Sequence, residues 1–380
     1  MTRAISLCVL MVLTQVSAGR VALGEDAEFH SAIARIKGVG REGVGNESAS
    51  RASRELAGRD AKALVPILAA IDESQPIAAN WLRAAVDTIA ARTLAAGLPL
   101  PQSDLEKFLR DRTRAGTARR LAYEWLIKVD PTTPDRLLPQ MLDDPGLELR
   151  RDAVIRALAH AEQLRENDEL EAKLAFKELL DSARDYDQVM DIAKRLESLG
   201  EKPNLTRQFG CVQSWHLIAP FDNTSKAGFG REFAPELEVD LQAEYPGKAE
   251  PIRWSTHITS DPFGIVDLNK VIGKHMGATA YGIAQVDSPA NQPVSIRVGS
   301  PNAIKVWLNG KLLCSRDEYH HGMSMDQYQS SGMLKSGRNT ILIKICQNEQ
   351  QEDWAQDWKF QLRVCDPTGR GIGQHIQEKK

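Results

Sequence analysis

The sequence contains no long apolar segment that could cross a membrane. Its most prominent apolar run, residues 4–13, has about half of the ~20 residues that a transmembrane helix needs. Arg3 precedes the run, and Val16-Ser17-Ala18 follows it with small residues where signal peptidase cleaves. The pattern predicts a signal peptide over residues 1–18, and therefore an exported protein that is periplasmic or extracellular.

The chain also lacks an excess of basic charge. It has 48 Lys and Arg residues against 51 Asp and Glu residues, which gives a formal net charge of -3 at pH 7. Proteins that bind nucleic-acid phosphates normally present a basic face. The composition therefore argues against nucleic acid as a partner, and arginine pairs such as Arg119-Arg120 are better explained as solvated helix surface.

Cysteine is scarce, and it is placed unevenly. One of the 5 cysteines lies in the predicted signal peptide, and export would permit disulfides among the rest. A hairpin pairing 340–346 with 358–365 would hold Cys346 about 20 Å from Cys365, beyond the ~7 Å limit for a disulfide. That bridge is disfavoured, whereas other pairings and buried free thiols both stay open. The four cysteines concerned are Cys211, Cys314, Cys346 and Cys365.

The amino-acid composition and the spacing of the apolar residues change near residue 204. Ala, Leu, Arg and Glu at helical spacing dominate residues 28–200, whereas Trp, Gly, Asn, Val and Ile at strand spacing follow. Gly200 and Pro203 mark a helix stop between the two parts. We predict an α+β protein with two domains. They are an α-helical domain over 25–203 and an antiparallel β-sandwich over 204–370, with a disordered tail over 371–380.

The helical part contains a weak repeat. Arg83, Arg119 and Arg150 each begin a segment with apolar residues three or four places apart, at intervals of 36 residues (83 to 119) and 31 residues (119 to 150). This periodicity predicts a solenoid, with an irregular helical bundle as the alternative. The segment DDPGLELRRDAVIRAL, residues 143–158, resembles a HEAT-type unit, because an Asp-Pro turn leads into an arginine-bearing helix.

The β part contains a clear hairpin signal. Asn309-Gly310 lies between apolar strand-forming residues and suits a type I′ turn, while Ile341, Ile343 and Ile345 alternate as in a buried strand. Many short strands with turns between them are typical of a sandwich or jelly roll. The strands are expected at 209–219, 251–258, 278–286, 294–299, 303–308, 311–314, 340–346 and 358–365, with a turn at 220–223 and core positions at Trp215, Trp254, Trp307 and Trp358.

The segments KVWLNGKLL (305–313) and LKSGRNTILIKI (334–345) resemble the galactose-binding-like jelly-roll modules found in glycoside hydrolases. With HLIAPFDN, EYPGK and GRNTILIKICQNEQ, the chain is also similar to secreted planctomycete-type proteins that join such a module to HEAT-like helices. The resemblance implies a fold more securely than a function. Many such modules bind glycans through loops at one end of the sandwich, and others do not.

Two loops of the β part combine aromatic and polar side chains, as a sugar site requires. We expect Tyr319 and Trp354 to stack on a sugar ring, with His320, His321 and Asp326 as polar contacts. A solvated loop, and packing of Trp354 over the hairpin end, are the alternatives. No spacing matches a metal site, and the sequence predicts no metal and no cofactor.

These observations predict an exported, non-catalytic binding or adaptor protein. The sandwich would recognise a glycan or an envelope protein, and the helical array would give a second interaction surface. The alternative is a carbohydrate-active enzyme, which needs two carboxylates that face each other across a cleft. Its candidate acids lie in the same two loops: Asp317, Glu318, Glu349, Glu352, Asp353 and Asp357.

Overall fold

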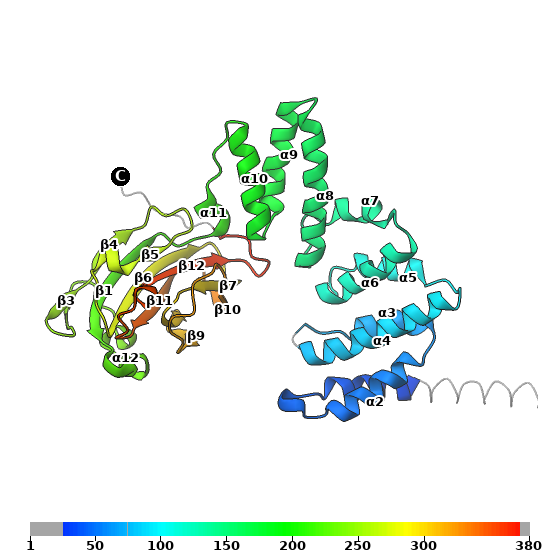
Figure 1. The fold of residues 1–380 in the computed structure, drawn as a ribbon, viewed down its shortest axis with the longest axis horizontal. Helices are drawn as coiled ribbons and strands as arrows, with labels where there is room; N and C mark the ends of the chain where they lie inside the picture. Colours follow the sequence, from blue (N-terminus) through cyan, green and yellow to red (C-terminus); the bar gives the residue numbers. More distant parts are fainter. Residues whose placement is uncertain (1–25, 74, 373–380) are drawn as a thin grey trace, which may run out of the picture. The chain divides into compact units, whose positions relative to one another are not determined.

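The computed structural model describes residues 26–73 and 75–372, so the predicted signal peptide and most of the predicted tail lie outside the described residues. Contacts divide the chain into two compact units, Met1–Ile192 and Ala193–Lys380. We call them the helical unit and the β unit. The predicted fold class is confirmed, because helices make up the N-terminal half and antiparallel sheets the C-terminal half (Figure 1). The domain boundary after residue 203 stays a prediction.

The helical unit is a succession of helices packed through an apolar core. None of the helices among the described residues is long and apolar enough to cross a membrane. After a helix over 26–37 come α2 (Asn46–Ala57), α3 (Leu64–Ala69), α4 (Pro76–Ala95), α5 (Gln102–Arg110), α6 (Gly116–Val129), α7 (Thr133–Leu137), α8 (Leu147–Arg165), α9 (Glu169–Ser182) and α10 (Tyr186–Ser198), which crosses the division between the units.

A series of ion pairs connects alternate helices in this unit. Each pair joins an arginine of one helix to a carboxylate of the next helix in the series, and the arginines lie in the segments that repeat in the sequence. The helices are therefore joined at a regular interval along the chain. The pairs are Arg83–Glu124 between α4 and α6, Arg120–Asp152 between α6 and α8, and Arg151–Asp187 between α8 and α10.

The Asp-Pro-Gly turn before α8 is anchored by a buried ion pair. Arg119 donates two hydrogen bonds to the Asp144 carboxylate, at 2.8 and 2.6 Å. The side chains are only 1% and 2% exposed, so Arg119 is not part of the solvated helix surface as we expected. Asp144 Oδ1 also accepts a hydrogen bond from the Gly146 amide at 2.8 Å. One carboxylate thus fixes both the turn and the start of the next helix.

The β unit contains two larger antiparallel sheets and one small one. Their orders are β4-β1-β6-β11-β8-β9, β10-β7-β12-β5 and β2-β3. A shared apolar core draws residues from both larger sheets, including Trp215 and Ile343 of the first and Ile296 and Leu362 of the second. The strands are β1 (Ser214–Asp222), β2 (Glu244–Pro246), β3 (Pro251–Arg253), β4 (Ser255–Ile258), β5 (Val266–Asp267), β6 (Ala278–Ser288), β7 (Gln292–Gly299), β8 (Ala303–Leu308), β9 (Lys311–Arg316), β10 (Tyr328–Leu334), β11 (Gly337–Gln347) and β12 (Lys359–Cys365).

The predicted hairpin at Asn309-Gly310 is confirmed. It joins β8 to β9, and both residues have the positive φ that a type I′ turn needs, 51° and 79°. Asn309 also ties the turn to the neighbouring strand, because its Oδ1 accepts from the Thr340 amide at 2.9 Å. The isoleucines of β11 face the core as predicted, with Ile341, Ile343 and Ile345 fully buried.

The opposite face of the six-stranded sheet is partly covered by residues 223–254. Lys344 lies there fully buried, and its Nζ donates 2.7 Å hydrogen bonds to Glu236 Oε1 and to the Arg231 carbonyl. Trp254 and Trp307 pack, partly buried, against the apolar cluster on this face. They therefore lie outside the core between the sheets where we expected them, whereas Trp215 and Trp358 are in that core.

Two predicted strands have other boundaries. Residues 205–209 form α11 (Leu205–Phe209), and β1 begins only at Ser214 and then continues through the predicted turn 220–223 as far as Asp222. Pro220 is accommodated because the pairing of β1 with β6 shifts register between Ile218 and Phe221. The predicted strand 251–258 is two strands, β3 paired with β2 and β4 paired with β1.

The hairpin of 340–346 with 358–365, on which the distance argument about Cys346 and Cys365 depended, does not form. β11 belongs to the six-stranded sheet and β12 to the four-stranded sheet, because the chain crosses between sheets after Gln347. The distance argument about Cys346 and Cys365 therefore does not apply. All four described cysteines are buried free thiols, and burial raises the pKa of Cys211 to about 12 and that of Cys346 to about 11.

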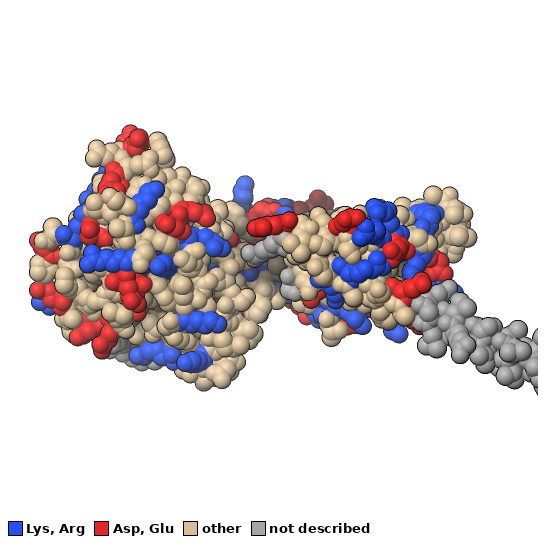
Figure 2. Space-filling view, turned by 90° about the horizontal axis from the view of Figure 1, so that it is seen from below, with Lys and Arg blue, Asp and Glu red and all other residues tan. Residues whose placement is uncertain are grey.

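The described part of the predicted tail begins within the sheet. Gly371 bridges to Cys365, and the Ile372 amide donates to the Val364 carbonyl at 2.9 Å. On the face shown in Figure 2, acidic and basic side chains are interspersed over each unit. This distribution agrees with the nearly balanced composition.

Candidate functional site

Three loops meet at one end of the β unit. They follow β1 (residues 223–228), connect β9 to β10 (317–327) and connect β11 to β12 (348–358). Asn223 ties the first loop to the second loop and to the end of β11, because its Nδ2 donates to the Gln347 carbonyl at 2.9 Å and to Tyr319 Oη at 3.3 Å. Asn223 is fully buried. The predicted residue Tyr319 is therefore held against the end of β11.

Tyr319 and Lys226 form one side of this end. Lys226 Nζ lies 5.0 Å from the centre of the Tyr319 ring, within the range of a cation–π contact. Burial raises the pKa of Tyr319 above its ordinary value, so the phenol stays protonated at neutral pH. Ser225 and Lys226 both have positive φ, 56° and 61°, and this conformation turns Lys226 back toward the other loops.

His320 connects the second loop to the third. Its backbone is left-handed (φ 60°), and its Nε2 lies 2.7 Å from Asn348 Oδ1. Asn348 Oδ1 also accepts from the Gln350 amide at 3.1 Å, which identifies it as the oxygen of the carboxamide. The hydrogen between the two side chains must then belong to His320 Nε2. His320 therefore acts as a donor that orders the start of the third loop.

Trp354 is displayed at the tip of the third loop. The residue is 65% exposed, and the His320 ring approaches its indole edge-on, with centroids 5.5 Å apart and planes at 86°. The next residue, Ala355, is fully buried, and its carbonyl accepts from Gln347 Nε2 at 2.8 Å. The turn is thus anchored from below while the indole faces solvent. We call the surface formed by Lys226, Tyr319, His320, Asn348 and Trp354 the Trp354 site.

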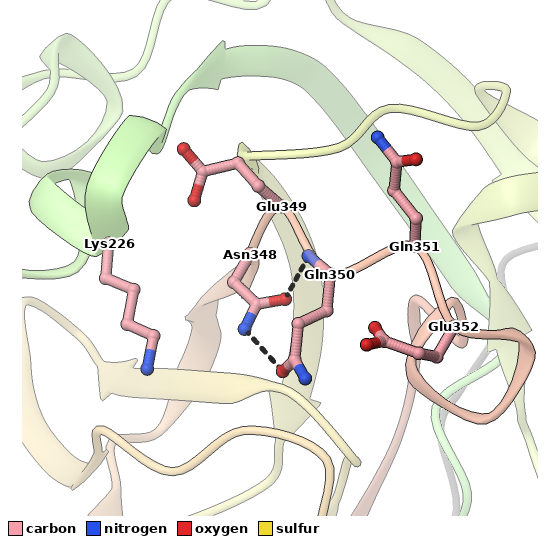
Figure 3. A pocket seen from close by; sticks show the side chains of 6 residues that line it. All are labelled: Lys226, Asn348, Glu349, Gln350, Gln351 and Glu352. Carbon is pink, nitrogen blue, oxygen red and sulfur yellow. Dashed lines mark hydrogen bonds between the residues drawn. The ribbon is translucent and has the colours of Figure 1, made fainter.

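A hollow of about 760 Å³ lies between Lys226 and the start of the third loop. In Figure 3, Asn348 and Gln350 lie in the middle, Lys226 faces them from the α12 side (Ala227–Gly230), and Gln351 and Glu352 border the other side. Glu349 also lines the hollow, and its Oε1 accepts from the Ser225 amide at 2.7 Å. Amide, carboxylate and ammonium groups in one hollow can hydrogen-bond a hydroxyl-rich ligand.

The structure assigns the other predicted residues to different clusters. His321 Nδ1 lies 2.7 Å from Gln327 Nε2, and Tyr328 donates to Glu318 at 2.8 Å. The two adjacent histidines therefore contact different partners. The left-handed conformations of His320 and Gly322 (φ 60° and 77°) turn the chain between these contacts.

Asp326 pairs, partly buried, with two nearly buried arginines. Its carboxylate accepts from Arg297 at 2.7 Å and from Arg363 at 2.6 Å. These arginines are direct cross-strand partners on β7 and β12. Asp326 thus fixes its loop to the four-stranded sheet, while Tyr319, His320 and Trp354 alone of the five predicted residues share the Trp354 site.

The sequence did not reveal Lys226 or Asn348 as members of this site, nor Asn223 as the residue that orders it. Asn223 lies in the predicted turn 220–223, Lys226 lies outside every predicted element, and Asn348 follows shortly after the predicted strand 340–346. The positive φ angles of Ser225 and Lys226 turn Lys226 toward the other loops, and neither residue type signals such a backbone. Among the described residues, no group of three or more His, Cys, Asp or Glu side chains could hold a metal ion.

Comparisons with known proteins add little. No family model matches the chain, and no curated protein matches it. Among solved structures, a β-glucosidase from Kluyveromyces marxianus in complex with glucose is 14% identical, with 41% of this chain and 17% of that chain covered and a TM-score of 0.25.

Two other solved structures are similarly distant. An anti-sigma factor domain-containing protein is 10% identical over 43% of this chain and 49% of that chain, with a TM-score of 0.24. A GH31 alpha-xylosidase from Xanthomonas citri is 10% identical over 41% of this chain and 16% of that chain, with a TM-score of 0.20. The chain thus spans less than half the length of each of these proteins, and likenesses this weak carry no functional argument.

Proposed function

We propose that the β unit, as a galactose-binding-like module, binds a glycan at the Trp354 site and that the chain is an exported, non-catalytic binding or adaptor protein. The exposure of Trp354 carries this proposal, together with its contact to His320, which in turn contacts Asn348 in the polar hollow. An indole offers an apolar face for the C–H side of a sugar ring, and the hollow offers hydrogen bonds for its hydroxyl groups. His320 and the buried Ala355 hold the indole in place before a ligand arrives, which reduces the entropy lost on binding.

The helical unit would supply a second interaction surface. Ion pairs that recur from helix to helix support a HEAT-like solenoid, and solenoids typically present an extended surface to partners. An envelope protein is the partner class that suits an exported chain of this kind. This part of the proposal is independent of the Trp354 site.

The proposal is tested by replacing Trp354 with Ala in the full chain. We expect retention on a glycan array to be lost while the thermal midpoint stays within about 1–2 °C, because an exposed side chain contributes little to stability. Met333→Ala is a matched control, since Met333 is 55% exposed and lies toward the other end of β10. It should leave glycan retention unchanged.

Two results would decide against the proposal. A marked fall in the thermal midpoint with unchanged retention would assign Trp354 to packing, for which a core aromatic truncation costs ~3–5 kcal/mol. Release of sugar products from the retained glycan, measured by chromatography, would favour a carbohydrate-active enzyme instead. Retention without turnover supports a binding protein.

A further inference from the structure

Three possible metal-ligand atoms lie close together where the loop between β9 and β10 meets the start of β10. Tyr328 Oη lies 2.8 Å from Glu318 Oε2 and 3.3 Å from His321 Nε2. His321 Nε2 and Glu318 Oε2 are 3.9 Å apart, and the two side chains are 25% and 58% exposed, so an ion can reach them from solvent. The third donor is a tyrosine, so the group is not a cluster of His, Cys, Asp and Glu side chains alone.

The three distances define a triangle that fits a transition-metal ion. The point equidistant from the three atoms lies about 2.0 Å from each of them, and bonds from such ions to histidine nitrogen or carboxylate oxygen are about 2.0–2.2 Å long. Seen from that point, Glu318 and His321 lie nearly opposite each other, and Tyr328 lies roughly at a right angle to Glu318. Three corners of a square are thus occupied, and square arrangements of nitrogen and oxygen donors are typical of Cu(II) or Ni(II).

We propose that Glu318, His321 and Tyr328 form a binding site for Cu(II), with a water molecule as the fourth ligand. Cu(II) is the divalent first-row ion that such donors bind most tightly. The ion replaces the hydrogen that Tyr328 donates to Glu318, so one Cu(II) enters and one proton leaves to solvent. Two anionic oxygens then face the ion and outweigh the charge of Arg316, which lies 5.2 Å from the centre of the Tyr328 ring. This site is separate from the Trp354 site and requires no glycan.

Gln327 lies where it can orient the imidazole of His321. Its Nε2 lies 2.7 Å from His321 Nδ1, and its Oε1 accepts from the Ser300 amide at 3.1 Å. Copper on Nε2 moves the imidazole hydrogen to Nδ1, so the carboxamide must turn over to accept that hydrogen and gives up the bond from Ser300. Metal-bound histidines commonly donate their second nitrogen to a carboxylate or a carbonyl. A carboxylate at position 327 should therefore favour the metal-bound state.

The test is a titration of the full chain, without an affinity tag, with Cu(II) in the presence of glycine as a weak competing chelator. We expect one Cu(II) per chain and a visible absorption band from charge transfer between phenolate and copper. His321→Gln and Glu318→Gln should each weaken binding at least about tenfold, because each removes a ligand. Tyr328→Phe keeps the ring but should remove the band. Gln327→Glu should tighten binding about three- to tenfold.

A matched control and a gain of affinity keep the test decisive. His257→Gln removes an imidazole from β4, where it pairs across the sheet with Trp215, and should change neither the affinity nor the band. Because Gln327→Glu is expected to gain affinity, its result cannot be attributed to unfolding. Copper that binds His321→Gln as tightly as the unchanged chain, or a band that persists in Tyr328→Phe, would contradict the site. Tighter binding of Zn(II) than of Cu(II) in the same competition would contradict the copper assignment.

Discussion

We expected Asp326 to contact a ligand, but its carboxylate is held by two arginines of the four-stranded sheet. Its carboxylate is the shared partner of Arg297 and Arg363, whose side chains are only 10% and 2% exposed. The two guanidinium groups face each other across β7 and β12, so without the carboxylate they would repel each other in a poorly solvated place.

Replacing Asp326 with Asn should therefore destabilise the protein. We expect a loss of about 3 kcal/mol in the free energy of unfolding, because two nearly buried arginines lose their counter-charge. Asn is chosen because it tolerates the left-handed backbone at this position (φ 58°). Urea denaturation followed by fluorescence measures the change.

Glu318→Gln is the matched control for Asp326→Asn. Glu318 lies in the same loop, but its side chain is 58% exposed, so Glu318→Gln should cost less than ~1 kcal/mol. A direct role of Asp326 in ligand binding predicts a different pattern. In that case Asp326→Asn would reduce glycan retention and leave the unfolding midpoint unchanged.

At the scale of single elements, the β8–β9 hairpin depends on backbone geometry. Gly310 has a φ of 79°, and a Cβ built there would have no atom within 4 Å. Gly310→Ala should thus cost about 1 kcal/mol through backbone strain alone. Gly230 also has open space but no positive φ, so Gly230→Ala should be nearly neutral. Equal unfolding free energies for both variants would contradict this account.

The sequence predicted those strands whose apolar residues alternate clearly or whose turns have characteristic residues. β8, β9 and β11 were predicted because their apolar residues alternate and an Asn-Gly turn marks the hairpin. β10 was missed because it lies at a sheet edge, with mostly polar or small side chains on a half-exposed strand. The sequence does not show that β11 and β12 lie in different sheets, since strands that are neighbours in sequence can either pair or belong to different sheets of a sandwich.

The sequence predicted only part of the candidate site, because several of its contacts depend on backbone turns and on residues that are distant in the sequence. Trp354 and Tyr319 stood out because aromatic residues are unusual in loops. The separation of His320 from His321 depends on left-handed turns at His320 and Gly322, which the sequence does not specify. The arginine partners of Asp326 lie 29 and 37 residues away, so no local pattern could reveal them.

The helical unit should lose stability in acid. Hydrogen bonds from Thr132 and Arg136 lower the pKa of Asp130 to about 2, and a hydrogen bond from Arg151 lowers the pKa of Asp187. A carboxylate with a depressed pKa in the folded state stabilises the fold at a pH above its unfolded pKa. That contribution disappears as the pH falls through the folded pKa.

The measurable consequence is a urea midpoint that depends on pH. The midpoint of the helical circular dichroism signal should decrease between pH 4 and pH 2, and Asp130→Asn should reduce the slope. The effect should be modest, because these carboxylates are largely solvated. A midpoint that does not change over this range would show that these hydrogen bonds persist when the carboxylates are protonated.

At the scale of the whole molecule, the transition from helix to sheet occurs within the β unit. α11 packs with the strands, since Arg363 Nε donates to the Phe209 carbonyl at 2.7 Å and Thr206 donates to the Pro262 carbonyl at 3.0 Å. Asn204 caps this helix by accepting from the Arg207 amide at 2.9 Å. A β fragment that keeps these contacts must therefore begin no later than Asn204.

We predict that residues 25–203 and 204–370 fold independently and that the chain is cut first near Glu201. Gly200 ends α10 with a positive φ of 76°, and residues 201–204 have no regular structure. A Glu-specific protease should cut after Glu201, and Glu201→Gln should suppress that cut. The C-terminal product would start at Lys202, retain the α11 cap, and show a circular dichroism spectrum dominated by antiparallel sheet. A product that is mainly helical, or one that unfolds once released, would mean that the sandwich depends on the helical unit for its stability.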